Sequence, residues 1–412
     1  MSMNGVTSTW GPDGLYADHS LSREMVRATR RWLDGECSLH DVREVADTLP
    51  QRRHVSLVVN NECNLECTHC FLQLPALVKN RLTRDEWMRV LESSIPQDIG
   101  QYIIAGKEAF VGKTGPAVIQ WLGDLRRQRP CVRTGLITNG TLLHKHHDLV
   151  RDAALSHMDI SMDGCEPDHD AIRGEGAFSR TKDNVRWAAD LLGDRLFVTL
   201  TLQKRNIARI GEALRSFADL GVRSAGISPF EKLPYNDHSL ALAPAELAEF
   251  FENLAEIGNL DLPHPMFIQA DACVVEPLAL LAFMESRWFD FDTMQIDGTG
   301  FLYCRHHLPN GITLSFRFLP FPMTLDSSVR VSADGELLCV DDARHPRTYH
   351  LNSLANLRDF DFDFGAAFDA AKRHPRMAHL DRQFEAKLMP RIRAAYRRNL
   401  ETRRAHRVAV PA

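Results

Sequence analysis

The sequence has no long hydrophobic run. In a chain of 412 residues, the longest apolar stretches, such as 277–284, fall well short of the ~20 residues that cross a bilayer. The first residues also show no basic stretch followed by an apolar one, as a secretory signal would require. We therefore expect a cytoplasmic protein without a membrane partner.

The chain also has no strong excess of one charge. Its formal net charge is −5, which gives no reason to expect nucleic acid as a partner. Hydrophobic residues make up 44% and charged residues 25%, as is typical of a soluble globular protein large enough for two domains. Only residues 384–407 are basic, in a helix-like run that indicates a solvated terminal helix or, alternatively, a contact for an acidic peptide or subunit.

Cysteines are few, and they are scattered along the sequence except for one cluster. There are nine, an odd number, and no export signal is expected, so the pattern does not favour a disulfide framework. Cys63, Cys67 and Cys70 stand within eight positions in the stretch NNECNLECTHCFLQ, and no second C-x-x-C motif accompanies them. Metal binding or catalysis explains this cluster better than disulfide formation.

Strand-like and helix-like segments alternate through the middle of the chain. Residues 20–49 read as two short helices. Short β-rich runs then follow, separated by amphipathic stretches, at 54–60, 101–106, 132–139, 157–163, 195–203 and 221–230. This alternation is typical of βαβ units with a parallel sheet. It predicts an α/β fold, a partial (β/α)6 TIM-like barrel.

We expect three parts along the chain. They are an N-terminal helical extension (1–50), the barrel (51–235) and a smaller α+β region (236–412) that caps the barrel mouth. The last part contains expected helices at 244–258 and 275–289, two hairpins with Asp-Gly turns, and the basic terminal helix.

Three thiolates from one short loop can converge on one metal centre, because thiolates are soft ligands. A structural zinc ion requires four ligands, and His69 could supply a fourth, at the cost of strain beside Cys70. An iron-sulfur cluster held through three of its irons fits better. It leaves one iron open for an external ligand.

The run CNLECTHC, directly after the first expected strand, resembles the C-x-x-x-C-x-x-C signature of the radical S-adenosylmethionine (radical SAM) superfamily. In this family the open iron of a [4Fe-4S] cluster is chelated by S-adenosylmethionine. A reductant such as flavodoxin or ferredoxin then drives cleavage to methionine and a 5'-deoxyadenosyl radical, which abstracts hydrogen from a substrate carbon. The resemblance covers about residues 54–230 and implies the radical SAM barrel.

Further motifs of that family follow in order. AGKEAF (105–110) resembles the Gly-Gly-Glu motif that holds the methionine amino group. Gly106 and Glu108 match this motif, and Lys107 replaces its second glycine. LITNGT (136–141) resembles the segment near the ribose, which implies contacts from Thr138 and Asn139.

The next two matches extend the resemblance. ISMDG resembles the Ser-x-Asp-Gly strand end and implies cofactor contacts from Ser161 and Asp163. HDAIRGEGAFSR (169–180) resembles the run found in the branch with SPASM or twitch extensions, and implies that Arg173 pairs with the methionine carboxylate. Near the adenine, where the family often has an aromatic residue, this chain has His69, and Phe71 shares the role.

The C-terminal part raises the question of an auxiliary cluster. Only Cys273, Cys304 and Cys339 are present there, too few for two complete auxiliary clusters. We favour a degenerate SPASM- or twitch-like extension without a cluster. One cluster with His306 or His307 as its fourth ligand is the alternative, and other uses of these thiols stay open.

A lone thiol near the substrate can instead donate a hydrogen atom to a product radical. Cys304, Cys339 and Cys165 are the candidates, and each is also compatible with a small buried core residue.

Resemblance to the SPASM-type branch implies modification of a peptide carbon, as in the maturation of ribosomal peptide natural products. An epimerase or dehydrogenase of an aminoglycoside or other sugar is the alternative. A metal- or cluster-binding module without turnover is a third possibility, which would need the thiols but not Glu108, Asn139 or Arg173.

Overall fold

The computed structural model describes residues 19–48, 53–70, 81–230, 232, 236–273, 277–296, 301–321, 328–339 and 353–409. Its strands are β1 (Arg53–Leu57), β2 (Ile99–Ile104), β3 (Arg133–Thr138), β4 (His157–Ser161), β5 (Leu196–Leu202), β6 (Ser224–Pro229), β7 (Phe267–Cys273), β8 (Gln295–Ile296), β9 (Leu302–His307), β10 (Thr313–Leu319), β11 (Ser328–Val331), β12 (Glu336–Cys339) and β13 (Ser353–Asn356). Within these residues they form one sheet in the order β13-β12-β11-β1-β2-β3-β4-β5-β6-β7-β10-β9-β8.

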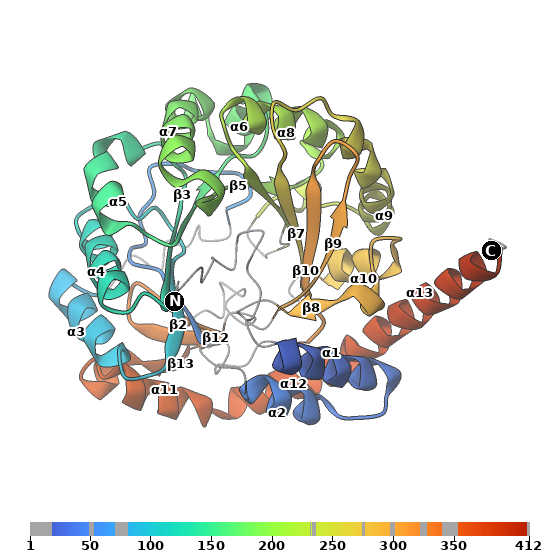
Figure 1. Ribbon diagram of the computed structural model, residues 1–412. Helices are drawn as coiled ribbons and strands as arrows, with labels where there is room; N and C mark the ends of the chain where they lie inside the picture. The colour runs from blue at the N-terminus through green and yellow to red at the C-terminus, as the bar shows by residue number, and fades with distance from the viewer. Residues whose placement is uncertain are drawn as a thin grey trace, which may run out of the picture.

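The middle of this sheet is the predicted barrel. β1 to β6 are parallel neighbours in chain order, and each overlaps one of the six predicted strands. The helices between them are α3 (Arg84–Ser94), α4 (Thr114–Gln128), α5 (His147–Ala153), α6 (Glu166–Arg173), α7 (Ala177–Leu192) and α8 (Ile210–Asp219). They surround the curved sheet in Figure 1. The prediction of an α/β partial barrel is confirmed.

Strands from the C-terminal region lengthen this sheet at both edges. β7 and β10 continue it in parallel beyond β6, and β11 pairs in parallel with β1 on the other side. Antiparallel strands finish the two edges, β9 and β8 beyond β10 and β12 and β13 beyond β11. One sheet therefore crosses the boundary expected near residue 235, and the division into three parts stays a prediction.

Helices from both ends of the chain bridge the two edges of the sheet. They are α1 (His19–Asp34), α2 (Leu39–Asp47), α11 (Phe364–Lys372), α12 (Pro375–Lys387) and α13 (Met389–Ala409). The interior helix α10 (Pro277–Glu285) packs against both α13 and β7. At one edge α11 packs against β12 and β13, and at the other α1 packs against β8 while α13 packs against α1 and α10. Figure 1 shows this row along the lower side of the barrel.

Local sequence explains several helix starts. Ser38 and Asp41 form a reciprocal capping box at α2, and Thr83 and Glu86 form another at α3. Pro244 occupies the first turn of α9 (Pro244–Asn253), where its missing N–H costs nothing.

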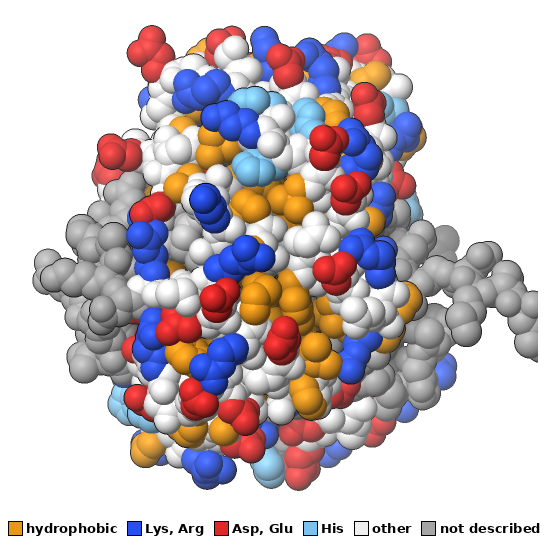
Figure 2. Space-filling view, turned by 90° about the vertical axis from the view of Figure 1, so that its left-hand side faces the viewer, with side chains coloured by type: hydrophobic (Ala, Val, Ile, Leu, Met, Phe, Trp, Pro, Cys, Tyr) orange, Lys and Arg blue, Asp and Glu red, His pale blue; other side chains and the backbone are white. Residues whose placement is uncertain are grey.

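The surface is mixed in charge where Figure 2 shows it. On this face, the side of α3, α4 and α5, acidic and basic side chains are intermingled and hydrophobic ones lie in small groups. None of the helices in the described ranges is long and apolar enough to span a membrane.

Trp32 connects the bridging helices. Its side chain is fully buried, stacks on Phe384 of α12 at 6.1 Å between ring centroids, and meets the edge of Phe321, two residues after β10, at 5.9 Å. Its carbonyl oxygen accepts a 2.7 Å hydrogen bond from Nη2 of Arg393 in α13. One residue thus joins three segments that lie far apart in the sequence.

We predict that Trp32→Ala destabilises the protein by about 3–5 kcal/mol, because the cavity left by a buried tryptophan relaxes only in part. Trp32→Phe, which keeps an aromatic ring at the site, should cost less than half as much. Denaturant unfolding followed by circular dichroism measures both. Equal stability of Trp32→Ala and the wild type would show that the bridging helices contribute nothing to the cooperative fold.

Candidate functional site

The three clustered cysteines lie in the loop that follows β1. Cys67 is buried, and Cys63 and Cys70 are half-buried. Burial raises the pKa of the Cys63 thiol and raises that of Cys67 to about 12. Thiolates are the form that binds metals, so a bound metal centre must offset the free-energy cost of ionising these buried thiols.

Hydrogen bonds hold the cysteine loop against its neighbours. The backbone N–H of Thr68 donates to the carbonyl oxygen of Ile172 at the end of α6 (3.0 Å). The Sγ of Cys63 accepts from the N–H of Leu65 (3.4 Å) and from Nδ2 of Asn139 (3.7 Å). Such hydrogen bonds to sulfur tune the potential of iron-sulfur clusters.

An amide network joins this loop to the segment after β3. Asn139 Nδ2 donates to Asn64 Oδ1 (3.1 Å), and Asn64 Nδ2 donates to Thr141 Oγ1 (2.8 Å). Asn139 Oδ1 in turn accepts from the N–H of Thr141 (2.9 Å). Asn64 and Thr141 were not predicted as site residues, although both stand inside the two motifs that pointed to Cys63 and Asn139.

Glu108 is fully buried beside this network. Its Oε1 accepts from Thr138 Oγ1 (2.8 Å) and from the N–H of Phe110 (3.2 Å), and its Oε2 accepts from the N–H of Asn139 (2.8 Å). Burial raises the pKa of Glu108 against the opposing effect of these donors. The carboxylate oxygens together have about four acceptor positions, so one remains for a further donor.

The turn before Glu108 accommodates the lysine at position 107. The left-handed residue is Gly106, with φ of +96°, whereas Lys107 is not among the described residues with positive φ. Asn60 Nδ2 holds the turn by donating to the carbonyl oxygen of Glu108 (2.8 Å). Lysine in place of the family's second glycine therefore brings no left-handed strain.

A buried ion pair lies at the end of β4. Arg173 Nε donates to Asp163 Oδ2 at 2.6 Å, and the side chains are 8% and 0% exposed. Burial alone would raise the pKa of Asp163, but Arg173, with smaller contributions that include the N–H of Thr201, lowers it to about 2. This bond uses only Nε, so the two terminal nitrogens of the guanidinium are not part of it.

Two histidines contact Asp163, one at its carboxylate and the other at its backbone N–H. His69 Nε2 lies 3.9 Å from Asp163 Oδ2, and burial lowers the pKa of His69. His169 Nδ1 accepts from the N–H of Asp163 (3.2 Å), and burial, with help from Arg173, lowers the pKa of His169 to about 4. Sequence reasoning did not select His169, although it opens the motif that contains Arg173.

The remaining predicted cofactor contacts are placed as follows. Ser161 is the last residue of β4, is half-buried, and pairs with Thr199 of β5. Phe71 lies outside the described residues. Asp159, two positions before Ser161, was not predicted; burial raises its pKa to about 7, and it accepts from Thr199 Oγ1 (2.8 Å).

The other predicted cysteines lie on separate elements. Cys304 of β9 is fully buried and donates to the carbonyl oxygen of Trp288 (3.4 Å), and burial raises its pKa to about 12. Cys339 is buried in β12, near the opposite end of the sheet. Cys165 precedes α6 and is half-buried, and burial raises the pKa of its thiol.

The side chain of Cys273 lies outside the described residues. Within the described ranges, no group of three or more His, Cys, Asp and Glu side chains is gathered closely enough to hold a single metal ion. Hydrogen-atom donation by these thiols and an auxiliary cluster with His306 or His307 stay predictions.

A known family model matches the stretch of the chain that contains this site. The model of the Radical SAM superfamily matches residues 57–217, from the end of β1 into α8. This match covers less than half of the chain, and it identifies this stretch as similar to a radical SAM domain. The matched stretch contains the cysteine loop, Glu108, Asn139 and the Asp163–Arg173 pair.

Relatives match this domain at low identity. The antilisterial bacteriocin subtilosin biosynthesis protein AlbA of Bacillus subtilis (strain 168) is 21% identical over 183 residues, which are 43% of this chain and 40% of AlbA. A probable GTP 3',8-cyclase of Methanocaldococcus jannaschii is 23% identical over 209 residues, which are 50% of this chain and 65% of that protein. The chain thus spans less than two thirds of either relative.

Solved structures show a similar fold over a longer stretch. Native anSMEcpe with bound AdoMet and Cp18Cys peptide has a TM-score of 0.54 and 13% identity, covering 80% of this chain and 82% of that one. Streptococcus suis SuiB bound to S-adenosylmethionine has a TM-score of 0.50 and 12% identity, covering 77% and 70%. Both likenesses cover more of this chain than residues 57–217, so the fold likeness extends beyond the matched domain.

The residues present fit the cofactors that the superfamily implies, a [4Fe-4S] cluster and S-adenosylmethionine. The donor set of three thiols from one loop leaves one iron of such a cluster without a protein ligand. A buried carboxylate and a buried guanidinium lie beside the loop, as the amino and carboxylate groups of the methionine require.

We predict that Arg173→Gln lowers the free energy of unfolding at neutral pH by about 3–5 kcal/mol, because the charge of Asp163 would remain buried without its partner. In the wild type, the stabilisation from the Asp163–Arg173 pair is fully present above the pKa of Asp163 in the unfolded chain, about 3.9. It is lost as pH falls through the pKa of Asp163 in the folded protein, about 2. The two proteins should therefore converge in stability between pH 4 and pH 2. Urea unfolding at several pH values measures this.

Arg186→Gln is the matched control, since Arg186 pairs with Asp183 on the exposed face of α7, where side-chain exposures are 54% and 75%. It should change stability by less than about 1 kcal/mol. Equal effects of the two substitutions at neutral pH would contradict the role given to the buried pair.

We also predict that the triple variant Cys63→Ser, Cys67→Ser and Cys70→Ser binds no iron after anaerobic reconstitution, whereas the wild type binds about four iron atoms per chain. Iron and sulfide assays measure this. Residual iron near four per chain in the variant would instead assign a second cluster to Cys273, Cys304 and Cys339.

Proposed function

We propose that this protein is a radical SAM enzyme that modifies a carbon atom of a peptide substrate. The observation that carries the proposal is one arrangement: three thiols after β1 lie against a buried carboxylate after β2 and a buried Asp163–Arg173 pair after β4. Active sites of parallel α/β sheets form at this edge.

Cys63, Cys67 and Cys70 would hold the cluster. When bound, the [4Fe-4S] cluster and S-adenosylmethionine supply the radical that takes a hydrogen atom from the substrate. The N–H of Leu65 and Nδ2 of Asn139 both donate to Cys63 Sγ, and this favours its thiolate form over the thiol.

Glu108 and Arg173 would bind the two ends of the methionine moiety. Glu108 keeps an acceptor position for the ammonium, and its backbone lies in the turn formed by Gly106 and Lys107. Arg173 would offer its terminal nitrogens to the carboxylate, while Asp163 holds the guanidinium through Nε.

Contacts to the nucleoside would come from the neighbouring segments. Thr138, Asn139 and Ser161, at or just after the ends of β3 and β4, would serve the ribose. His69 lies in the cysteine loop, and burial lowers its pKa, so it offers a neutral ring surface for the adenine. Phe71 would share this role.

The C-terminal region would close the site. A carbon radical must be kept from solvent, and β7, β10 and β11 extend the barrel wall on both sides. A flavodoxin or ferredoxin would supply the electron. Whether Cys165, Cys304 or Cys339 returns a hydrogen atom to the product depends on the reaction outcome.

Two comparisons support a peptide as the substrate. AlbA is named for biosynthesis of subtilosin, a bacteriocin, and the anSMEcpe structure contains a Cp18Cys peptide. Both likenesses are at low identity, so they support the substrate class and not the reaction.

We expect reconstituted protein with dithionite and S-adenosylmethionine to release 5'-deoxyadenosine, and Cys67→Ala to abolish this release. Cys131→Ser is the matched control, because Cys131 is exposed and lies between α4 and β3; it should keep wild-type activity. Liquid chromatography with mass spectrometry measures the product. Wild-type protein with a complete cluster that forms no 5'-deoxyadenosine, with or without candidate substrates, would refute the enzymatic proposal.

The substrate class is tested with short peptides encoded beside the gene. A mass change in such a peptide that requires S-adenosylmethionine and Cys67 is the expected result. Modification of an aminoglycoside or other sugar under the same conditions, with no change in any peptide, would contradict the proposed substrate class.

A further inference from the structure

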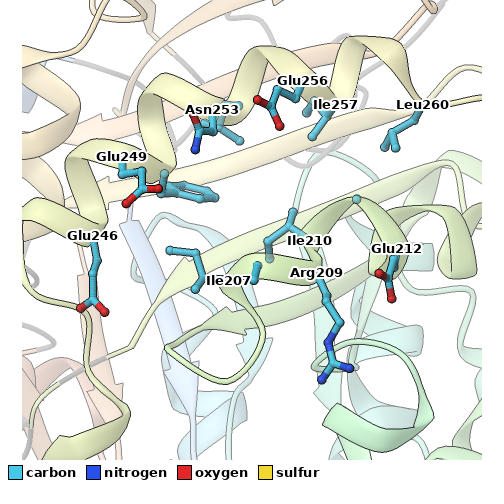
Figure 3. A pocket seen from close by; sticks show the side chains of 14 residues that line it. Ile207, Arg209, Ile210, Glu212, Glu246, Glu249, Asn253, Glu256, Ile257 and Leu260 are labelled. Atoms are coloured by element: carbon cyan, nitrogen blue, oxygen red, sulfur yellow. The ribbon is translucent and has the colours of Figure 1, made fainter.

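A groove lies outside the barrel between two helical segments. Its volume is about 540 Å³. One wall is the 3-10 turn Ile207–Arg209 with the start of α8, and the other is α9 with the turn Leu254–Asn259 that continues it. Figure 3 shows the two walls facing each other, with Ile210 opposite Asn253 and Glu249. The groove is separate from the cysteine loop.

The groove has an apolar floor. The side chains that form it come from both walls: Ile207, Ile210, Phe250, Leu254, Ile257 and Leu260. Phe250, Leu254 and Ile257 are 7%, 2% and 6% exposed, so they are anchored in the core and present only one surface to the groove. Such a floor matches apolar side chains spaced along one face of a helix.

Carboxylates surround this floor. Four glutamates and one arginine line the groove. Glu212, Glu249 and Glu256 are exposed, while Glu246 lies 3.7 Å from Lys204. The arginine, Arg209, is already hydrogen-bonded to the buried carboxylate of Asp168. The groove therefore presents a net negative rim to its occupant.

The groove lies one short helix away from the cysteine loop. Arg209 in its wall bonds to Asp168 of α6, and Ile172 of the same helix accepts the hydrogen bond from Thr68 in the loop. These two α6 residues are four positions apart, about 6 Å along a helix. The groove wall and the cysteine loop are therefore connected through α6.

We propose that this groove binds a basic amphipathic helical segment of the peptide substrate and holds it while another part of the peptide enters the barrel. Apolar side chains of the segment pack on the floor, and its Lys or Arg side chains pair with Glu212, Glu249 and Glu256. The inference rests on the proposed function for its substrate, and it adds a recognition site that the radical chemistry does not require.

The test uses a designed probe, because the natural segment is unidentified. A labelled peptide of about 18 residues carries leucine at helical spacing and lysine elsewhere. Two comparison peptides have the same composition in scrambled order, or glutamate in place of lysine. Fluorescence anisotropy with the reconstituted full chain measures binding. We expect only the basic amphipathic peptide to bind, and to bind more weakly as salt rises from about 50 to 200 mM.

Charge reversal identifies the surface. Glu249→Lys with Glu256→Lys should weaken binding of the basic peptide at least tenfold, since like charges then face each other. The control is Asp219→Lys with Glu252→Lys, which makes the same charge change on α8 and α9 at exposed residues outside the groove. It should alter binding by less than about threefold.

Several results would overturn the inference. These are equal binding of the scrambled peptide, stronger binding of the acidic peptide, and equal loss in the groove and control variants. A change of oligomeric state in the groove variant, seen by analytical ultracentrifugation, would assign the groove to a second copy of this chain instead.

Release of 5'-deoxyadenosine separates this inference from the proposed function. The groove variant should form 5'-deoxyadenosine at the wild-type rate in the absence of peptide, because neither glutamate contacts the cysteine loop or its polar neighbours. Normal release without selective peptide binding refutes the groove site alone. Absence of release in the wild type refutes the enzymatic proposal, whatever the peptide result.

Discussion

The parallel register of β1 to β6 is the constraint on which the candidate site depends. All six strands end on the same edge of the sheet, so the loops after β1, β2, β3 and β4 meet there although they are far apart in sequence. The cysteine loop is then fixed by hydrogen bonds to two of these loops, through Asn139 and Ile172. A change of register would move these partners away from the thiols.

Electrostatics at this edge follows from burial. Asp163, Glu108 and Arg173 are all nearly or fully buried, and each has a charged or hydrogen-bonding partner that offsets the loss of water. Asp163 stays ionised because of Arg173, whereas burial dominates at Glu108. The site thus holds the Asp163–Arg173 ion pair beside Glu108, a carboxyl group whose pKa is raised by burial.

The ends of the chain complete the fold. α1 lies at one edge of the sheet and α11 at the other, and the helices between them are joined by Trp32 and by the 2.7 Å Arg43–Asp381 ion pair. The basic run near the C-terminus, which the sequence left open between a solvated helix and a contact surface, is partly used within the chain. Arg393 bonds to Trp32, and Arg403 bonds to Asp290.

The sequence by itself determined the alternation of strands and helices, the three-thiol loop and the order of the motifs, because these depend on residue type and spacing within short segments. It also located Lys107 as a departure from the family, but only the backbone revealed that the left-handed residue is Gly106. Tertiary structure decided the partners of Arg173 and Glu108, the Asn64–Asn139 contact and the groove between α8 and α9. Each joins separate elements, and Arg393 and Trp32 are 361 positions apart, so only packing brings them together.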